Sequence, residues 1–392
     1  MIHVRQTTDE RPTPYVDPLL QLERIELIEI ELPLKSAFRT SFGVTTKRRV
    51  IIVRVTDKSG AAGFGECTAM EQPLYNEETV DTARAVITST VVPILSLAEV
   101  SHARDIGPAL SAIKGNRMAI AAVETAVWDL EAKLLNQSLS DHLGGSLHEI
   151  ACGVSIGLQE SPAVLVEKVA HELDAGYQRI KIKIMPGEDV ELVSAVRREF
   201  PEITLSVDAN SAYCLQHDLE TMRRLDDFGL LMIEQPLAAG DLWEHSMLQR
   251  LIRTPICLDE SITGLRDVRQ ALEMGACQII NIKLGRVGGH AEARKIQQLA
   301  KESSIPVWCG GMLETGIGRA HNIAMSTLDG FTLPGDVSSS ERYWEKDIIS
   351  PPVTVGPGGT IPVPSGPGIG YDVDEKFINE LTTRTASLPF ET

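Results

Sequence analysis

The sequence predicts an α/β protein in which a TIM-like (β/α)7β barrel follows an N-terminal α+β capping domain. From about residue 151, short apolar and β-branched runs alternate with helical stretches, which is typical of parallel βαβ units. A succession of seven such runs, with a weaker eighth near Phe331, favours a closed barrel over an open sheet. The seven runs are residues 151–156, 180–184, 203–207, 230–233, 255–258, 278–282 and 305–309.

The capping domain begins with strand patterns. Charged and apolar side chains alternate over residues 24–34, and an apolar run over 50–55 continues the antiparallel pattern. Residues 35–44 between them are too rich in Ser, Thr and Gly for a regular element, so we expect a mobile flap there. A core-facing helix follows, because apolar residues recur at intervals of three and four at Ile120, Val123, Val127, Leu130 and Leu134.

These patterns divide the chain into four parts. We assign residues 1–22 to a flexible N-terminal extension and 23–145 to the capping domain. Residues 146–335 form the catalytic barrel. The remainder, 336–392, is rich in Pro and Gly, and we expect it to return over the surface to the capping domain.

Composition narrows the class of protein. With 43% apolar and 23% charged residues the chain resembles a soluble globular protein, and its net charge of −17 disfavours nucleic acid and membrane partners. A small anionic carboxylate substrate therefore needs a site with local positive charge or a metal. No secretory signal is visible, no stretch reaches the length of a membrane span, and the six scattered cysteines are expected to be buried thiols. We expect a cytoplasmic homo-oligomer.

Ionisable residues recur where the predicted barrel strands end. They are Lys181, Lys183, Asp208, Glu234, Asp259 and Lys283, and from Lys183 onward they lie 24 to 26 residues apart, about one βα unit. Equivalent positions at the C-terminal ends of barrel strands converge on one mouth. Taken singly, each motif is more often a solvated strand face, a turn or a helix cap; the joint spacing makes the functional interpretation much stronger.

This set suggests a metal-assisted proton transfer. Three carboxylates on neighbouring strands repel one another, and a hard dication that accepts oxygen ligands relieves the repulsion, with Mg2+ the best fit. Lys181 and Lys183 share one face of their strand, and each ammonium disfavours the charge of the other, so Lys183 becomes a usable base. Lys283 lies on the other side of the trio, so a carbon acid could lose a proton from either face.

The same motifs resemble those of the enolase superfamily, muconate-lactonizing subgroup. They are Lys181-Ile-Lys183, Asp208-Ala-Asn210, Ile233-Glu-Gln-Pro236, Leu258-Asp-Glu-Ser261 and Asn281-Ile-Lys283. The resemblance runs from about residue 24 to the end. It implies a lysine base that removes the proton alpha to a carboxylate, with an enediolate stabilised by Mg2+, for which Mn2+ can substitute.

Finer motifs resemble the o-succinylbenzoate synthases and N-acylamino acid racemases of that subgroup. They are residues 285–289, 310–316 and 333–338 together with Arg342-Tyr343, although Leu284 stands where these relatives have proline. The resemblance implies catalytic roles for Lys183, Lys283 and Lys181 and metal ligation by Asp208, Glu234 and Asp259. It further implies substrate contacts from Ser155, Asn210, Gly311 and Met312, supported by Glu260 and Arg286.

Several activities remain open. Dehydration of a cyclohexadiene acid is our leading interpretation, and racemisation of N-acylamino acids, alone or as a dual activity, is the alternative. A dipeptide epimerase is disfavoured because an Asp-x-Asp motif is absent around the eighth strand, and an inactive barrel scaffold is disfavoured because the strand-end set is complete.

Three other patterns indicate different chemistry and are rejected. Residues 153–157 match the G-x-S-x-G nucleophile elbow, but the next helix begins later, at Ser161-Pro162. Gly288-Gly289 before a helix falls short of a nucleotide-binding fingerprint. No histidine occupies a strand-end position, which argues against a zinc hydrolase.

Overall fold

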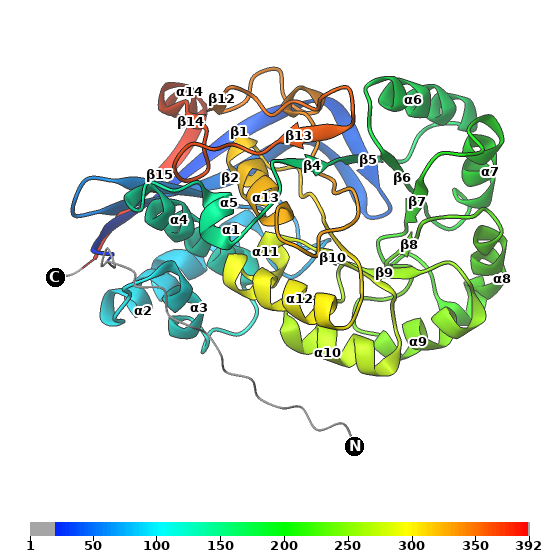
Figure 1. Ribbon diagram of the computed structural model, residues 1–392, viewed down its shortest axis with the longest axis horizontal. Coiled ribbons are helices and arrows are strands. Elements are labelled where there is room, and N and C mark those ends of the chain that lie inside the picture. Colours follow the sequence, from blue (N-terminus) through cyan, green and yellow to red (C-terminus); the bar gives the residue numbers. More distant parts are fainter. Residues whose placement is uncertain (1–19, 391–392) are drawn as a thin grey trace.

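The computed structural model describes residues 20–390, in which an antiparallel sheet with its helices packs beside a ring of parallel strands surrounded by helices (Figure 1). Most of the predicted N-terminal extension, residues 1–19, lies outside the described part. Leu20 is buried and the first strand starts at Leu22. The α/β fold class predicted from the sequence is confirmed.

The antiparallel sheet has the strand order β15-β1-β2-β3. Its members are β1 (Leu22–Thr40), β2 (Gly43–Asp57), β3 (Ala62–Cys67) and β15 (Thr382–Pro389). The end of the chain thus pairs with its beginning. Helix α4 (Arg117–Leu134) lies directly on β3, because a Cβ at Gly63 or Gly65 would stand only 2.1 or 2.2 Å from backbone oxygens of this helix.

The expectation of an irregular flap at residues 35–44 was wrong. Strands β1 and β2 continue to a hairpin tip, where Thr40 faces Gly43, with a shift of register between Pro33 and Phe38. Backbone bonds also join this hairpin to the C-terminal segment, where the Lys35 amide donates to Tyr343, and to the barrel, where the Leu158 amide donates to Arg39, both at 2.9 Å. Partners for its backbone groups, rather than side-chain propensity, make the segment regular.

The capping domain also contains α1 (Val80–Val86), a π-helical turn (Ile87–Val91), α2 (Val92–Leu97), α3 (Ile106–Ala109) and α5 (Leu139–Leu143). The first three join into one helical stretch, Val80–Leu97, which within residues 20–390 is long and apolar enough to cross a membrane by length and composition. The sequence expectation that no stretch reaches this length was therefore wrong. Core helices meet the same criteria, and Val80, Ile87 and Val91 are buried in the capping-domain core.

The barrel strands run parallel in the order of the sequence, β5 to β11. They are β5 (Gly153–Ile156), β6 (Arg179–Lys183), β7 (Leu205–Asp208), β8 (Ile233–Glu234), β9 (Ile256–Leu258), β10 (Ile279–Ile282) and β11 (Val307–Cys309). The weak eighth run makes single bridges on both sides, from Phe331 to Val307 and from Gly335 to Cys152. This segment closes the ring between β11 and β5.

Helices cover the outside of the barrel (Figure 1). They are α6 (Pro162–Asp174), α7 (Val190–Glu199), α8 (Leu215–Asp226), α9 (Leu242–Leu251), α10 (Leu265–Met274), α11 (Leu284–Val287), α12 (His290–Glu302) and α13 (Gly316–Ser326). Because α6 starts at Pro162, Ser155 ends a strand rather than forming a nucleophile elbow. Leu284 occupies the first position of α11, a position that also suits proline.

The C-terminal segment contains short elements before β15. They are a 3-10 turn (Ser340–Arg342), β12 (Ile349–Ser350), β13 (Thr360–Pro362), β14 (Asp372–Val373) and α14 (Glu375–Leu381). Strand β13 pairs with β4 (Glu149–Ala151), so Ala151 belongs to this small sheet and not to the barrel. Among the cysteines Cys214 is exposed, which corrects the expectation that all six are buried.

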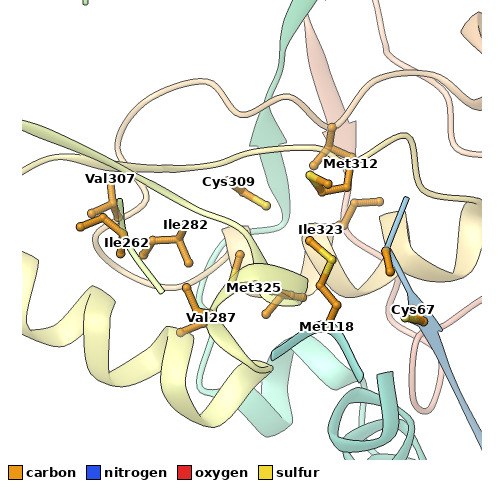
Figure 2. Close-up of a cluster of buried hydrophobic side chains, with 14 of the residues drawn as sticks. Cys67, Met118, Ile262, Ile282, Val287, Val307, Cys309, Met312, Ile323 and Met325 are labelled. Carbon is orange, nitrogen blue, oxygen red and sulfur yellow. The ribbon is translucent and has the colours of Figure 1, made fainter. Parts of the chain in front are cut away.

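The two domains share a core and two buried carboxylates. In Figure 2, Cys67 and Met118 of the capping domain lie close to Met312 and Ile323 of the barrel in one apolar cluster. Two capping-domain side chains also accept hydrogen bonds from backbone amides at the starts of barrel helices, Glu66 at α13 and Glu124 at α12. The capping domain thereby supplies the N-terminal caps that these helices lack.

Candidate active site

The strand-end residues predicted from the sequence meet at the C-terminal mouth of the barrel. Lys183 lies opposite Asp208, and Asp208 lies opposite Glu234, in the register of adjacent strands. Asp259 directly follows β9 and Lys283 directly follows β10. All of these side chains are buried, so their charges must compensate one another within the site.

Each lysine at the mouth forms an ion pair with a carboxylate. The Nζ of Lys181 lies 2.6 Å from Glu234, that of Lys183 lies 2.5 Å from Asp208, and that of Lys283 lies 2.7 Å from Asp259. A fourth carboxylate, which sequence reasoning missed, is Asp336, 2.7 Å from Lys181 and 2.7 Å from Arg179. Asp336 follows the weak eighth strand. The same search for ionisable residues at strand ends finds it once the end of that strand is known.

These contacts shift the pKa values in opposite directions. Burial alone would lower the pKa of Lys181, but attraction to Asp336, Glu234 and Asp208 outweighs it and raises that pKa. Burial would raise the pKa of Asp208, yet Lys183 and Lys181 lower it below its ordinary value. Burial together with repulsion from Asp208 raises the pKa of Glu234. The charged forms of Lys181 and Asp208 are therefore favoured by their neighbours, whereas the charged form of Glu234 is disfavoured.

The three predicted metal ligands fit a hard dication in their chemistry. Asp208, Glu234 and Asp259 supply buried carboxylate oxygens from neighbouring strand ends, as Mg2+ prefers. In their present arrangement each is held by a lysine ammonium, and within residues 20–390 no three His, Cys, Asp or Glu side chains are grouped closely enough to hold an ion. Ammonium groups provide the positive charge that a metal ion would otherwise provide.

Neighbouring polar residues orient this set. Asn210 accepts a hydrogen bond from Lys183 at 2.7 Å, and its amide donates to Glu260 at 2.9 Å. The Arg286 guanidinium donates to Asp259 and to two backbone oxygens, Ile262 and Asn281. Glu260 keeps one buried oxygen without a partner. Of the two residues that the sequence assigned to a supporting role, Arg286 contacts the metal-ligand candidate Asp259, and Glu260 contacts Asn210.

Tyr75 reaches the site from the loop between β3 and α1 of the capping domain. Its hydroxyl donates to Asp259 at 3.1 Å and accepts from Lys283 at 3.3 Å and from Arg286 at 3.2 Å. The Lys283 Nζ also lies 4.7 Å from the centre of the ring. Sequence reasoning missed Tyr75, because it stands in a loop with no periodic relation to the barrel strands.

A cavity of about 60 Å³ opens beside the lysines. Its lining includes Lys181, Lys183, Lys283, Ser155, Gly311, Leu313, Glu314, Arg319, Asn322, Asp336 and Val337, with Phe38 and Tyr343 at one side. Of the predicted substrate contacts, Ser155 and Gly311 line this cavity. Asn210 and Met312 do not: Asn210 contacts Lys183 instead, and the Met312 side chain packs in the interdomain cluster of Figure 2.

Phe38 of the hairpin and Tyr343 of the C-terminal segment line this cavity on one side. Phe38 and Tyr343 stand edge to face with ring centres 6.4 Å apart. Both also line a much larger outer hollow of about 970 Å³ between the hairpin and α6. The described arrangement is therefore a mostly closed site, with room for a few water molecules.

Comparison with known families agrees with this geometry. Residues 164–377 match the family described as "Enolase C-terminal domain-like", and residues 24–144 match the "Mandelate racemase / muconate lactonizing enzyme, N-terminal domain". The chain belongs to the enolase superfamily. The resemblance stated from the strand-end motifs is thereby confirmed.

Individual members of the enolase superfamily are similar over nearly the whole chain. An o-succinylbenzoate synthase of Geobacillus stearothermophilus is 50% identical over 93% of this chain and 96% of its own length. An N-succinylamino acid racemase of Amycolatopsis sp is 46% identical over 93% of this chain and 98% of its own length. A crystal structure of an enolase superfamily member from Listeria innocua superposes with a TM-score of 0.91 at 40% identity, covering 95% of this chain and all of that one.

Proposed function

We propose that this chain is a magnesium-dependent o-succinylbenzoate synthase that dehydrates a cyclohexadiene carboxylic acid in menaquinone synthesis. The observation that carries the proposal is that Lys183 and Lys283 both line one cavity beside three buried carboxylates. The 50% identity to an o-succinylbenzoate synthase supports the choice of reaction. A cytoplasmic location and assembly into a homo-oligomer are parts of the same proposal.

Asp208, Glu234 and Asp259 would hold the metal ion, Mg2+ or its substitute Mn2+. When bound, the ion would stabilise the negative charge that develops on the substrate carboxylate. The three lysines that line the cavity would also attract that carboxylate, which supports binding of a small anion by a chain of net charge −17.

In the proposed reaction Lys183 acts twice. Its neutral amine removes the proton from the carbon alpha to the carboxylate, leaving an enediolate. Lys283 stays protonated and stabilises this planar anion from the other side. The hydroxyl on the neighbouring carbon then departs with the proton from Lys183, so one molecule of water leaves and the ring becomes aromatic.

Racemisation of N-succinyl or other N-acylamino acids is the second candidate. It uses the same first step, but Lys283 must return a proton to the opposite face of the alpha carbon. The position of both lysines on the cavity wall and the 46% identity to an N-succinylamino acid racemase favour it. Dehydration needs one proton-transferring lysine, whereas racemisation needs two.

The two reactions are tested by replacing the lysines in turn. We expect Lys183→Ala to abolish both dehydration and racemisation, measured as loss of diene absorbance and of optical rotation. A Lys183→Ala protein that retains wild-type dehydration while remaining folded would refute the proposed role of this base.

A further inference from the structure

Lys181 lies between carboxylates that have different roles. Its Nζ is 2.6 Å from Glu234, a predicted metal ligand, and 2.7 Å from Asp336, which is not in the predicted ligand set. The same Nζ is 3.3 Å from Asp208, a second predicted ligand. Lys181 is only 2% exposed, so its ammonium depends on these carboxylates, and not on water, for compensation of its charge.

The contact between Lys181 and Glu234 competes with binding of a metal ion. One oxygen of Glu234 accepts from the Lys181 ammonium, and the other accepts from the Asn281 side-chain amide at 2.7 Å. Since both oxygens are engaged, an ion that binds Glu234 has to displace a partner or share an oxygen with it. Two cations at one buried carboxylate repel each other, because the protein interior screens charge poorly.

Asp336 offers Lys181 a counter-ion outside the predicted ligand set. One Asp336 oxygen pairs with Lys181, and the other accepts from Arg179 at 2.7 Å. Arg179 is fully buried, donates to the Pro334 carbonyl oxygen at 2.9 Å, and holds its Cζ 4.8 Å from the centre of the Trp308 ring. Arg179 thus holds the Asp336 carboxylate in place independently of Lys181.

We propose that Asp336 is a positioning residue that retains the Lys181 ammonium when Glu234 binds the metal ion, so that ion and lysine do not compete. The inference rests on the proposed function, since it requires that Glu234 bind a divalent cation. Asp336 acts through Lys181 and not on the ion. A lysine retained by Asp336 still lines the cavity, where it can attract the substrate carboxylate.

Binding of Mn2+ to the metal-free protein tests this role without an activity assay, because the electron paramagnetic resonance signal of free Mn2+ reports the dissociation constant. In Asp336→Asn, Lys181 keeps only the metal-ligand carboxylates as charged partners. We therefore expect the Kd for Mn2+ to rise about 10- to 100-fold, as for other residues that support metal ligands. Lys181→Met removes the competing ammonium, so its Kd for Mn2+ should equal or lie below that of the wild type.

A double-mutant cycle separates this role from a general structural one. If Asp336 acts through Lys181, adding Asp336→Asn to Lys181→Met should change the Kd for Mn2+ by less than about threefold. An equal rise in Kd with and without Lys181 would overturn the inference, and so would an Asp336→Asn protein with the Kd of the wild type. Should Asp336→Asn fail to fold, Arg179→Met/Asp336→Asn removes the buried pair together and carries the same predictions.

Asp347→Asn is the matched control. Asp347 is also a buried carboxylate, but it accepts from the backbone amides of Gly316 and Ile348, at 2.8 and 2.7 Å, and does not line the cavity. Its replacement should change the Kd for Mn2+ by less than about threefold, and a rise as large as in Asp336→Asn would overturn the inference. A wild-type protein that binds no Mn2+ would instead overturn the proposed function, and this inference with it.

Discussion

Lys183 and Lys283 are the same residue type in two different settings. Lys183 contacts one carboxylate and the Asn210 side chain, whereas Lys283 contacts Asp259, the Tyr75 hydroxyl and the Tyr75 ring. Burial would lower the pKa of Lys283, but the neighbouring groups, Tyr75 and Glu260 first among them, raise it. This asymmetry suits a reaction in which one lysine moves protons and the other keeps its charge.

We predict that Lys283→Arg separates the two candidate reactions. Arginine keeps a positive charge but cannot give up a proton near neutral pH, so racemisation should fall by about 100- to 10,000-fold. Dehydration should fall far less, by about tenfold. Solvent deuterium incorporation at the alpha carbon of each enantiomer measures the first effect, and loss of diene absorbance measures the second. Equal loss of both activities would contradict the proposed division of roles.

Tyr75 gives a second prediction at this scale. Tyr75→Phe keeps the ring beside Lys283 and removes only the hydroxyl that contacts Asp259, Lys283 and Arg286. We expect kcat to fall about three- to tenfold with KM little changed, because the hydroxyl orients groups of the site and does not bind substrate. Tyr75→Ala should lose more. A Tyr75→Phe enzyme with unchanged kcat and an unchanged pH–rate profile would exclude this role.

Individual site residues could be predicted from the sequence only where they recur at the spacing of the βα units. The strand-end lysines and carboxylates share a spacing of one βα unit, and the parallel barrel converts that spacing into proximity. Tyr75 and Arg319 come from a loop and from a helix wall, where no period relates them to the others. Tyr75 enters the site only because the two domains pack together, which local sequence patterns do not encode.

At the scale of elements, carboxylates of the capping domain complete helices of the barrel. Glu124 accepts from the amides of His290 and Ala291, both at 2.8 Å, and from the Trp128 indole at 2.7 Å. Gly289 precedes this helix with φ of +112°, and a Cβ there would lie 2.2 Å from Glu124. The glycine pair that resembled a phosphate loop thus makes room for a protein carboxylate at the helix N-terminus.

Removing this interdomain cap should destabilise the protein. Glu124→Ala leaves buried amide and indole donors unsatisfied, and we expect the free energy of unfolding to fall by about 2–3 kcal/mol. Glu124→Gln keeps one acceptor oxygen and should cost less. Urea unfolding followed by tryptophan fluorescence measures the change. A Glu124→Ala protein within about 0.5 kcal/mol of the wild type would show that water replaces the cap.

The two capping carboxylates also predict how stability depends on pH. Burial raises the pKa of Glu66 to about 7 and that of Glu124 to about 7, against the opposing effect of their hydrogen-bond donors. Between about pH 4.5 and 7 the folded protein therefore binds more protons at these sites than the unfolded chain does, so this contribution to stability falls as pH rises. The free energy of unfolding is measured with urea at pH 5 and at pH 7.5. Between these two pH values the wild type should lose more stability than the double variant Glu66→Gln/Glu124→Gln. An unchanged difference between the two proteins would contradict the assignment.

Helices and strands were predicted correctly from the sequence where they depend little on contacts with distant parts of the chain. The seven barrel runs and the α4 stripe follow from local patterning, and the structure has strands and a helix there. The hairpin tip at residues 35–44 was not predictable, because its regular structure depends on backbone bonds to Tyr343 and Leu158, far along the chain. The eighth strand was visible only weakly, since it is reduced to two single bridges.

At the scale of the whole molecule, the distribution of charge and the packing of the two domains both determine the site. A chain of net charge −17 concentrates lysine and arginine side chains around one small cavity, which the capping-domain hairpin covers. Strand β15, which follows the barrel in the sequence, pairs with β1 and so completes the antiparallel sheet of the capping domain. We predict a single cooperative unfolding transition for both domains, measured by coincident circular dichroism and fluorescence curves. Two separate transitions would contradict a shared core.

The most direct test of the central claim is an assay of the purified wild-type protein with Mg2+, with and without EDTA. Loss of diene absorbance from the cyclohexadiene acid and loss of optical rotation from N-succinylamino acids are followed in parallel. The account predicts fast dehydration that EDTA abolishes and that added Mg2+ restores. Dehydration that is insensitive to EDTA, or no proton abstraction from either substrate, would contradict it.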